Sequence, residues 1–145
     1  MIVPDLNLLI YAHNEAAPGH DAARNWWESL LRGSERIGVP WMVVCGFLRL
    51  TTQRRFYEGP LTPEYATATV SDWFAVTSVM PLNPGAQHWA ILRRLLVDVG
   101  VGGNLVTDAH IAALAIEHQA EVHSNDSDFA RFSGLRWRNP LLEGR

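Results

Sequence analysis

The chain of 145 residues contains no lysine, so all 12 of its basic residues are arginines. Enzymes that depend on a lysine side chain are therefore excluded. These are the P-loop NTPases with their Gly-Lys-Ser/Thr motif, the protein kinases with their strand lysine, and the Schiff-base enzymes.

Cysteine and long apolar runs are scarce as well. Cys45 is the only cysteine, which excludes a disulfide within the chain and a zinc site built from several cysteines. Because Cys45 lies in an apolar stretch, we expect a buried, unreactive thiol. No uncharged run approaches the roughly 20 residues of a membrane span, and the first residues lack the basic region of a signal peptide. We therefore expect a cytoplasmic protein without a membrane partner.

Apolar residues make up 48% of the chain and charged residues 19%, a composition typical of a globular protein with its own core. We found no internal repeat, low-complexity tract or linker, so we expect one domain over residues 1–145. The formal net charge of -3 is unlike that of a protein that coats duplex nucleic acid, which is normally strongly basic.

Short apolar segments alternate with segments of helical periodicity. The pattern predicts strands at 2–4, 36–39, 78–82 and 121–124, with a possible edge strand at 135–138. It predicts helices from residue 6 and over 20–32, 40–54, 62–74, 84–99 and 104–118. This order indicates an α/β fold with a central, mainly parallel β-sheet of four to five short strands flanked by helices.

Three aspartates from distant parts of the chain lie where such a sheet would bring them together. Asp5 follows the first predicted strand, Asp126 follows the fourth, and Asp108 lies in about the first turn of the helix after the Gly100–Gly103 loop. Sites in open parallel sheets lie beyond the carboxyl ends of the strands. Carboxylates brought so close repel one another, and a hard divalent cation such as Mg²⁺ or Mn²⁺ would relieve that repulsion.

Each aspartate taken alone also has a simpler structural explanation. Asp5 is a suitable N-cap for the helix that follows it, and Asp126 and Asp128 belong to a good turn sequence. Asp108 would favour the dipole of its own helix. The shared position of the three at one sheet edge favours the metal site.

The chain resembles the PIN-domain ribonucleases, and most closely the VapC toxins of toxin–antitoxin pairs. The resemblance rests on VPDLNLLIYAHN from Val3, VPWMVVCGFLRLTT from Val39, NLVTDAHIAALAIEHQAEVHSNDSDFARF from Asn104, and GLRWRNPL from Gly134. By this resemblance Asp5, Asp108 and Asp126 are the metal-binding and catalytic acids. It gives a supporting or substrate-contacting role to the polar residues Asn7, Ser124 and Asp128.

The resemblance implies a Mg²⁺-dependent endoribonuclease that accepts Mn²⁺ as a substitute and cleaves a structured RNA, either a tRNA or an rRNA. It also implies a homodimer and inhibition by a VapB-type antitoxin. A haloacid-dehalogenase-like phosphatase or a receiver domain would also carry an aspartate after its first strand. Both normally need the lysine that this chain lacks.

One position departs from the family pattern. The family normally carries a glutamate on the helix after the second strand, and Gly46 stands at the matching position. The alternative function is therefore a degenerate PIN-like module that binds RNA or protein with weak or no nuclease activity. Arg49 lies on the same helix face as Gly46 and is a candidate phosphate contact. Asn104, four residues before Asp108, is a candidate for ordering a metal-bound water.

The arginines fall in local groups that would offset the acidic balance of the chain near an RNA. These groups are Arg49, Arg54 and Arg55; Arg93 and Arg94; and Arg131, Arg136 and Arg138. A negative net charge therefore does not exclude an RNA substrate.

Overall fold

The computed structural model describes residues 1–54 and 59–142. Its centre is a parallel sheet of five strands in the order β3-β2-β1-β4-β5. The strands are β1 (Ile2–Pro4), β2 (Ile37–Pro40), β3 (Val79–Leu82), β4 (Glu121–His123) and β5 (Arg136–Arg138). The predicted α/β fold is therefore confirmed, including the edge strand near the end of the chain.

Six α-helices and one short 3₁₀ helix surround this sheet. They are α1 (Leu6–His13), α2 (His20–Arg32), α3 (Trp41–Thr51), α4 (Pro63–Ala75), α5 (His88–Val99), α6 (Leu105–Glu117) and η1 (Ser127–Arg131). Within the described ranges, none of these helices combines the length and the apolar character needed to cross a bilayer.

Two helix boundaries differ from the sequence prediction, and the structure gives the reasons. The helix expected from residue 84 begins at His88, because the Glu117 carboxylate accepts hydrogen bonds from the backbone N–H groups of Gly85 and Gln87 and holds them in a loop. The helix expected to reach residue 54 ends at Thr51. There the Thr51 carbonyl accepts a hydrogen bond from the N–H of Leu61, and the chain turns away.

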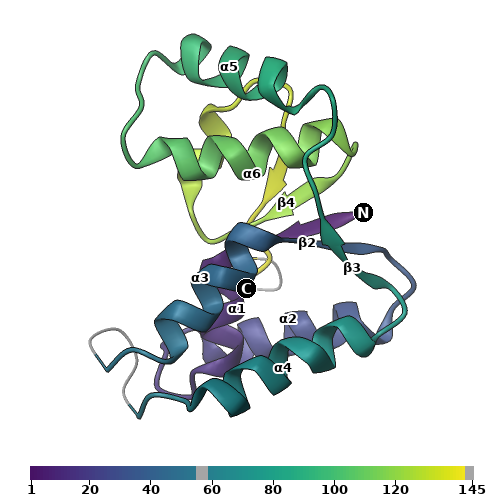
Figure 1. Cartoon of the computed structure of the whole chain (residues 1–145), viewed down its shortest axis with the longest axis vertical. Coiled ribbons are helices and arrows are strands. Elements are labelled where there is room, and N and C mark those ends of the chain that lie inside the picture. The colour runs from purple at the N-terminus through teal and green to yellow at the C-terminus, as the bar shows by residue number, and fades with distance from the viewer. Residues whose placement is uncertain (55–58, 143–145) are drawn as a thin grey trace.

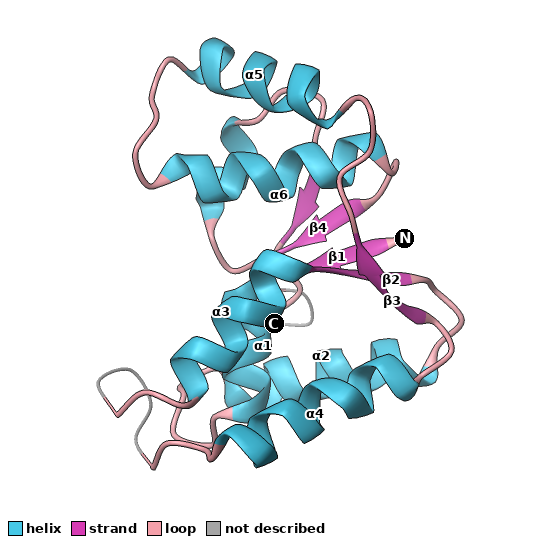
Figure 2. Ribbon diagram, in the orientation of Figure 1, coloured by secondary structure: helices cyan, strands magenta, loops and turns pink. Residues whose placement is uncertain are grey.

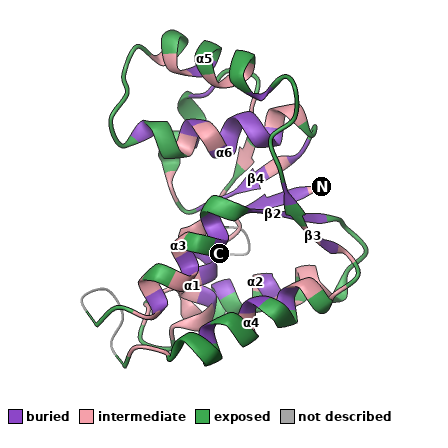
Figure 3. Ribbon diagram, viewed as in Figure 1, coloured by how far each residue is buried: buried purple, intermediate pink, exposed green. Residues whose placement is uncertain are grey.

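The helices lie on both sides of the sheet (Figures 1 and 2). Helices α5 and α6 cover one side, while α2 and α4 lie on the other, with α1 and α3 running from the carboxyl edge of the sheet. The central strands are buried on both faces, and Val3, Ile37, Val39 and Val122 are fully inaccessible (Figure 3). Strands buried on both faces need apolar residues at successive positions, which explains the short apolar runs in the sequence.

Cys45 corrects one expectation from the sequence. We expected a buried thiol, but Cys45 is exposed on α3. The buried side of α3 consists of Val43, Val44, Phe47 and Thr51. Since Cys45 lies two residues from both Val43 and Phe47, helical geometry turns it away from that side. An apolar stretch in a helix does not bury every residue that it contains.

We expect Phe47→Ala to lower the free energy of unfolding by about 3 to 5 kcal/mol. Phe47 is fully buried, and its ring meets those of Trp73 and His13 at centroid distances of 4.6 and 5.2 Å. Denaturant unfolding followed by circular dichroism measures this loss. Val97→Ala on the exposed side of α5 is the control, with an expected change within about 0.5 kcal/mol. A loss below about 1 kcal/mol for Phe47→Ala would contradict the packing described.

Candidate metal centre

The sheet topology brings the ends of two distant strands together. Strands β1 and β4 are parallel neighbours, with Ile2 opposite Glu121 and Pro4 opposite His123. Asp5 follows β1 directly, and its N–H donates to the carbonyl of His123 at 2.9 Å. Asp126 lies three residues after the end of β4, so both aspartates belong to the carboxyl edge of the sheet.

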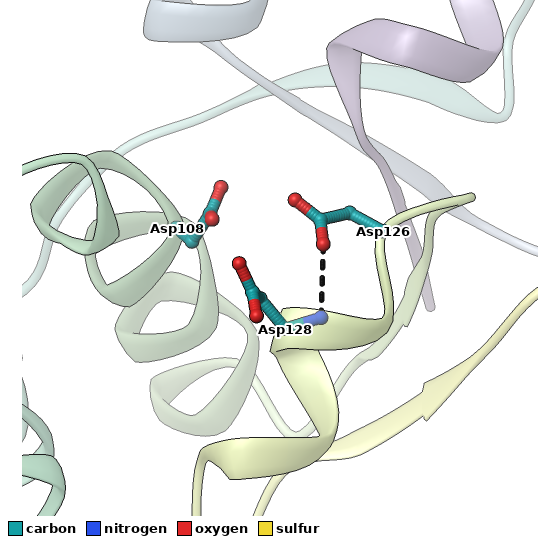
Figure 4. Close-up of side chains that lie close together, drawn as sticks. All are labelled: Asp108, Asp126 and Asp128. Carbon is teal, nitrogen blue, oxygen red and sulfur yellow. Dashed lines mark hydrogen bonds between the residues drawn. The ribbon is translucent and has the colours of Figure 1, made fainter.

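Three carboxylates converge at this edge (Figure 4). Asp108 projects from the first turn of α6, and Asp126 and Asp128 come from the segment that enters η1. One oxygen of each carboxylate lies within 4.8 Å of the others. The N–H of Asp128 also donates to Oδ1 of Asp126 at 2.9 Å, so Asp126 caps η1 as well. The capping role and a ligand role are therefore compatible in the same residue.

Asp5 lies beside these carboxylates but is held differently. Its side chain is 7% exposed and accepts hydrogen bonds from Oγ of Ser124 at 2.6 Å and from the N–H of Leu6 at 2.8 Å. It therefore caps α1, as one of the structural explanations predicted, while one edge of its carboxylate is held by the end of β4.

The Ser124 hydroxyl links the two halves of the centre. Besides donating to Asp5, its Oγ accepts from Nδ2 of Asn7 at 3.2 Å and from the N–H of Asp126 at 2.9 Å. Oδ1 of Asn7 accepts in turn from the N–H of Asn125 at 3.3 Å. Asn7 and Ser124 therefore set the positions of the aspartates on either side of them.

Burial and mutual repulsion raise the pKa values of two of the aspartates. Partial burial, and then the charges of Asp5, Asp126 and Asp128, raise the pKa of Asp108 to about 6. Burial raises the pKa of Asp5, while the hydrogen bonds from Ser124 and Leu6 lower it. A cation placed between carboxylates with pKa values raised in this way stabilises their charged forms strongly. The donor set consists of oxygen atoms, which suits a hard divalent ion such as Mg²⁺ or Mn²⁺.

Three further positions were singled out from the sequence. Arg49 is exposed on α3, and Asn104 is exposed just before α6 begins. Within residues 1–54 and 59–142, the hydrogen-bond network around Ser124 includes neither of them. An ideal Cβ on Gly46 would lie 2.6 Å from Cδ2 of Leu6. Leu6 therefore occupies the space into which a longer side chain at position 46 would begin to extend, a neighbour that sequence reasoning did not identify.

A family model described as the PIN domain matches residues 2–135. The chain belongs to the PIN-domain family. Ribonuclease VapC37 of Mycobacterium tuberculosis is 44% identical to it over 97% of each chain. Ribonuclease VapC33 of the same organism is 42% identical, over 99% of this chain and all of the relative. Like these relatives, which are named VapC ribonucleases, this PIN-domain protein is an endoribonuclease of the VapC type.

Solved structures support the same fold. VapBC2 from Rickettsia felis, bound to a promoter DNA fragment, aligns with a TM-score of 0.70 at 19% identity, covering 96% of this chain and 98% of that chain. VapC20 of Mycobacterium tuberculosis, described as a sarcin-ricin loop cleaving toxin, aligns with a TM-score of 0.65 at 17% identity over 94% and 99%. PIN-domain nucleases generally depend on a divalent metal ion, and this chain has an acidic cluster that suits one.

We expect Asp108→Asn to stabilise the metal-free protein at pH 7.5. The folded-state pKa of about 6 exceeds the ordinary 3.8, so ionised Asp108 costs stability above pH 6, and this cost disappears as the pH falls from 6 toward 4. After a discount for solvent screening, the gain is about 1 kcal/mol, or about 2 to 4 °C in Tm. Thermal scans at pH 7.5 and 5.0 in EDTA measure it.

Thermal scans of the wild type and Asp108→Asn with added Mn²⁺ test whether Asp108 binds the metal. Mn²⁺ should raise the Tm of the wild type more than that of Asp108→Asn, because a ligand that binds only the folded state stabilises it. Equal shifts in both proteins would argue against Asp108 as a ligand.

Ser124→Ala should lower the free energy of unfolding by about 1 to 3 kcal/mol. The substitution removes the side-chain donor of the buried Asp5 carboxylate and leaves it only the N–H of Leu6, which raises the pKa of Asp5 further. Ser124→Thr keeps the hydroxyl and should recover most of the loss. Urea unfolding at pH 7.5 measures both variants, and equal stabilities of the alanine variant and the wild type would contradict the role of Ser124.

Proposed function

We propose that the chain is the toxin of a toxin–antitoxin pair that cleaves a structured RNA, either a tRNA or an rRNA, with Mg²⁺ or Mn²⁺ held by Asp5, Asp108 and Asp126. The observation that carries this proposal is the convergence of carboxylate oxygens from α6 and from the segment after β4 within 4.8 Å. We extend the ligand set to Asp128, because it belongs to that cluster.

The residues of the centre have different roles, as metal ligands, as residues that position those ligands, and as a phosphate contact. Asp108, Asp126 and Asp128 present oxygens from two segments, and Asp5 approaches from the end of β1. When bound, a divalent cation supplies a polarised water for in-line attack on a phosphodiester and offsets charge on the leaving oxygen. Asn7 and Ser124 keep the carboxylates in place, and the exposed Arg49 is available to a phosphate that approaches α3.

The degenerate binding module remains as the competing function, because Gly46 replaces the usual glutamate. Two observations favour the nuclease. Four aspartates remain at the sheet edge, and the relatives that share 42 to 44% of their residues with this chain are named ribonucleases.

We further propose a VapB-type antitoxin as partner and a homodimer as the assembled toxin. Solved neighbours support the antitoxin, since VapBC2 from Rickettsia felis and VapBC from Salmonella typhimurium are both VapBC complexes bound to DNA. The homodimer rests on the family resemblance.

Asp126→Asn should reduce cleavage of total RNA in Mg²⁺ or Mn²⁺ by at least about 100-fold, because it removes one charged ligand from the centre. Asp72→Asn, on the exposed side of α4, removes the same charge elsewhere and should leave the rate unchanged. Sequencing of the new RNA ends identifies the cut site.

The competing function predicts a different result. If the wild type cuts no RNA while a Gly46→Glu variant does, the chain is a binding module. Because a glutamate at position 46 must displace Leu6, Gly46→Glu is also prepared with Leu6→Ala, which makes room for it. Undiminished cleavage by Asp126→Asn would contradict the proposed centre itself.

A further inference from the structure

A cavity of about 380 Å³ opens beside the metal centre, between α1, α3 and α6. Asp5 and Asp108 line it, so it is continuous with the carboxylate cluster. Its other walls are mostly apolar and include Tyr11, Met42 and Leu50. The volume falls within the roughly 300 to 1,000 Å³ typical of small-molecule sites.

We propose that this cavity receives one unpaired nucleobase of the RNA, from a nucleotide next to the phosphate that is cleaved. The inference rests on the proposed nuclease function. A phosphate held at the carboxylates places the neighbouring nucleotide at the cavity, because Asp5 and Asp108 border both. The apolar walls offer nothing to a second phosphate, so the base and not the backbone enters.

The chemistry of the lining suits a base. Tyr11 contributes an aromatic side chain to the lining, and proteins that read RNA commonly stack unpaired bases on such rings. Asn7 and Thr107 add an amide and a hydroxyl at the wall, which can meet the polar edge of a base. A flat ring with a polar edge can pair with the Thr107 hydroxyl, whereas an aliphatic side chain could not.

Gly46 explains why this cavity is apolar so close to the catalytic acids. Leu6 lines the cavity, and the distance from its Cδ2 to an ideal Cβ at position 46 would be only 2.6 Å. A glutamate at that position would displace Leu6 and add a charge near the cavity, whereas glycine leaves the leucine in place. Glycine at position 46 is therefore compatible with an apolar wall at the Leu6 side of the cavity.

The test begins with the cut site found by sequencing RNA ends. A synthetic RNA that carries this site is prepared intact and with a single abasic nucleotide at each position flanking the cut. We expect one abasic position to lower kcat/KM by about tenfold or more, in line with the stacking free energy of a base on an aromatic ring, and the others to change it little.

Leu50→Trp fills the cavity without touching a carboxylate, and Val97→Trp on the exposed side of α5 is its matched control. Leu50→Trp should lower kcat/KM on the intact RNA about tenfold. On the sensitive abasic RNA it should cleave as the wild type does, because that RNA already lacks the base that would enter the cavity. An unchanged Tm shift with Mn²⁺ shows that the centre is intact. Tyr11→Leu, which keeps apolar volume but removes the ring, should show the same pattern more weakly.

Three outcomes would count against the inference. Equal rates on intact and abasic RNAs would overturn the base site while leaving the nuclease in place. A Leu50→Trp protein that cleaves intact RNA normally but escapes inhibition by its antitoxin would assign the cavity to that protein instead. Absence of any cleavage by the wild type would overturn the proposed function, and the base site with it.

Discussion

The hydroxyl of Ser124 is the contact on which the arrangement of the centre depends. It donates to Asp5 after β1, accepts from Asn7 on α1, and accepts from the N–H of Asp126. One buried side chain thereby joins two parallel strands at the edge where their carboxylates converge. The parallel pairing of β1 and β4 brings these groups within reach of one another, and Ser124 sets their final positions.

The arrangement is costly for the metal-free protein. Burial disfavours the charged form of Asp5, and burial together with three neighbouring carboxylates raises the pKa of Asp108 to about 6. A fold that holds such groups together without a cation gives up stability for function, as is common at active sites. Packing in the core, with its fully buried strands and the ring cluster of Phe47, Trp73 and His13, offsets this loss of stability.

Much of this could be predicted from the sequence, because the signals were local. Strand positions followed from short apolar runs, and the helix starting at Pro63 followed from Thr62, whose side chain accepts from the N–H of Tyr65 as an N-cap. Asp5 and Asp126 were predicted as ligands because strand ends are recognisable and a parallel sheet aligns them, and Asp108 because it lies near the start of the helix after the glycine loop. Asp128 was assigned only a supporting place, since turn chemistry explained it fully and nothing local indicated the direction of its carboxylate.

Other features depended on contacts between segments far apart in the chain. The start of α5 was shifted by Glu117 of α6, and the side of α3 that faces solvent, with Cys45 on it, was decided by the packing of its neighbours. The apolar cavity is lined by residues of α1, α3 and α6, and Leu6 in its wall packs over Gly46 of α3. The sequence by itself determined the fold class and the acids at the strand ends, since periodicity and chain order encode both. Only the tertiary structure decided how those acids are held and what lies beside them, because these depend on side chains that meet only after folding.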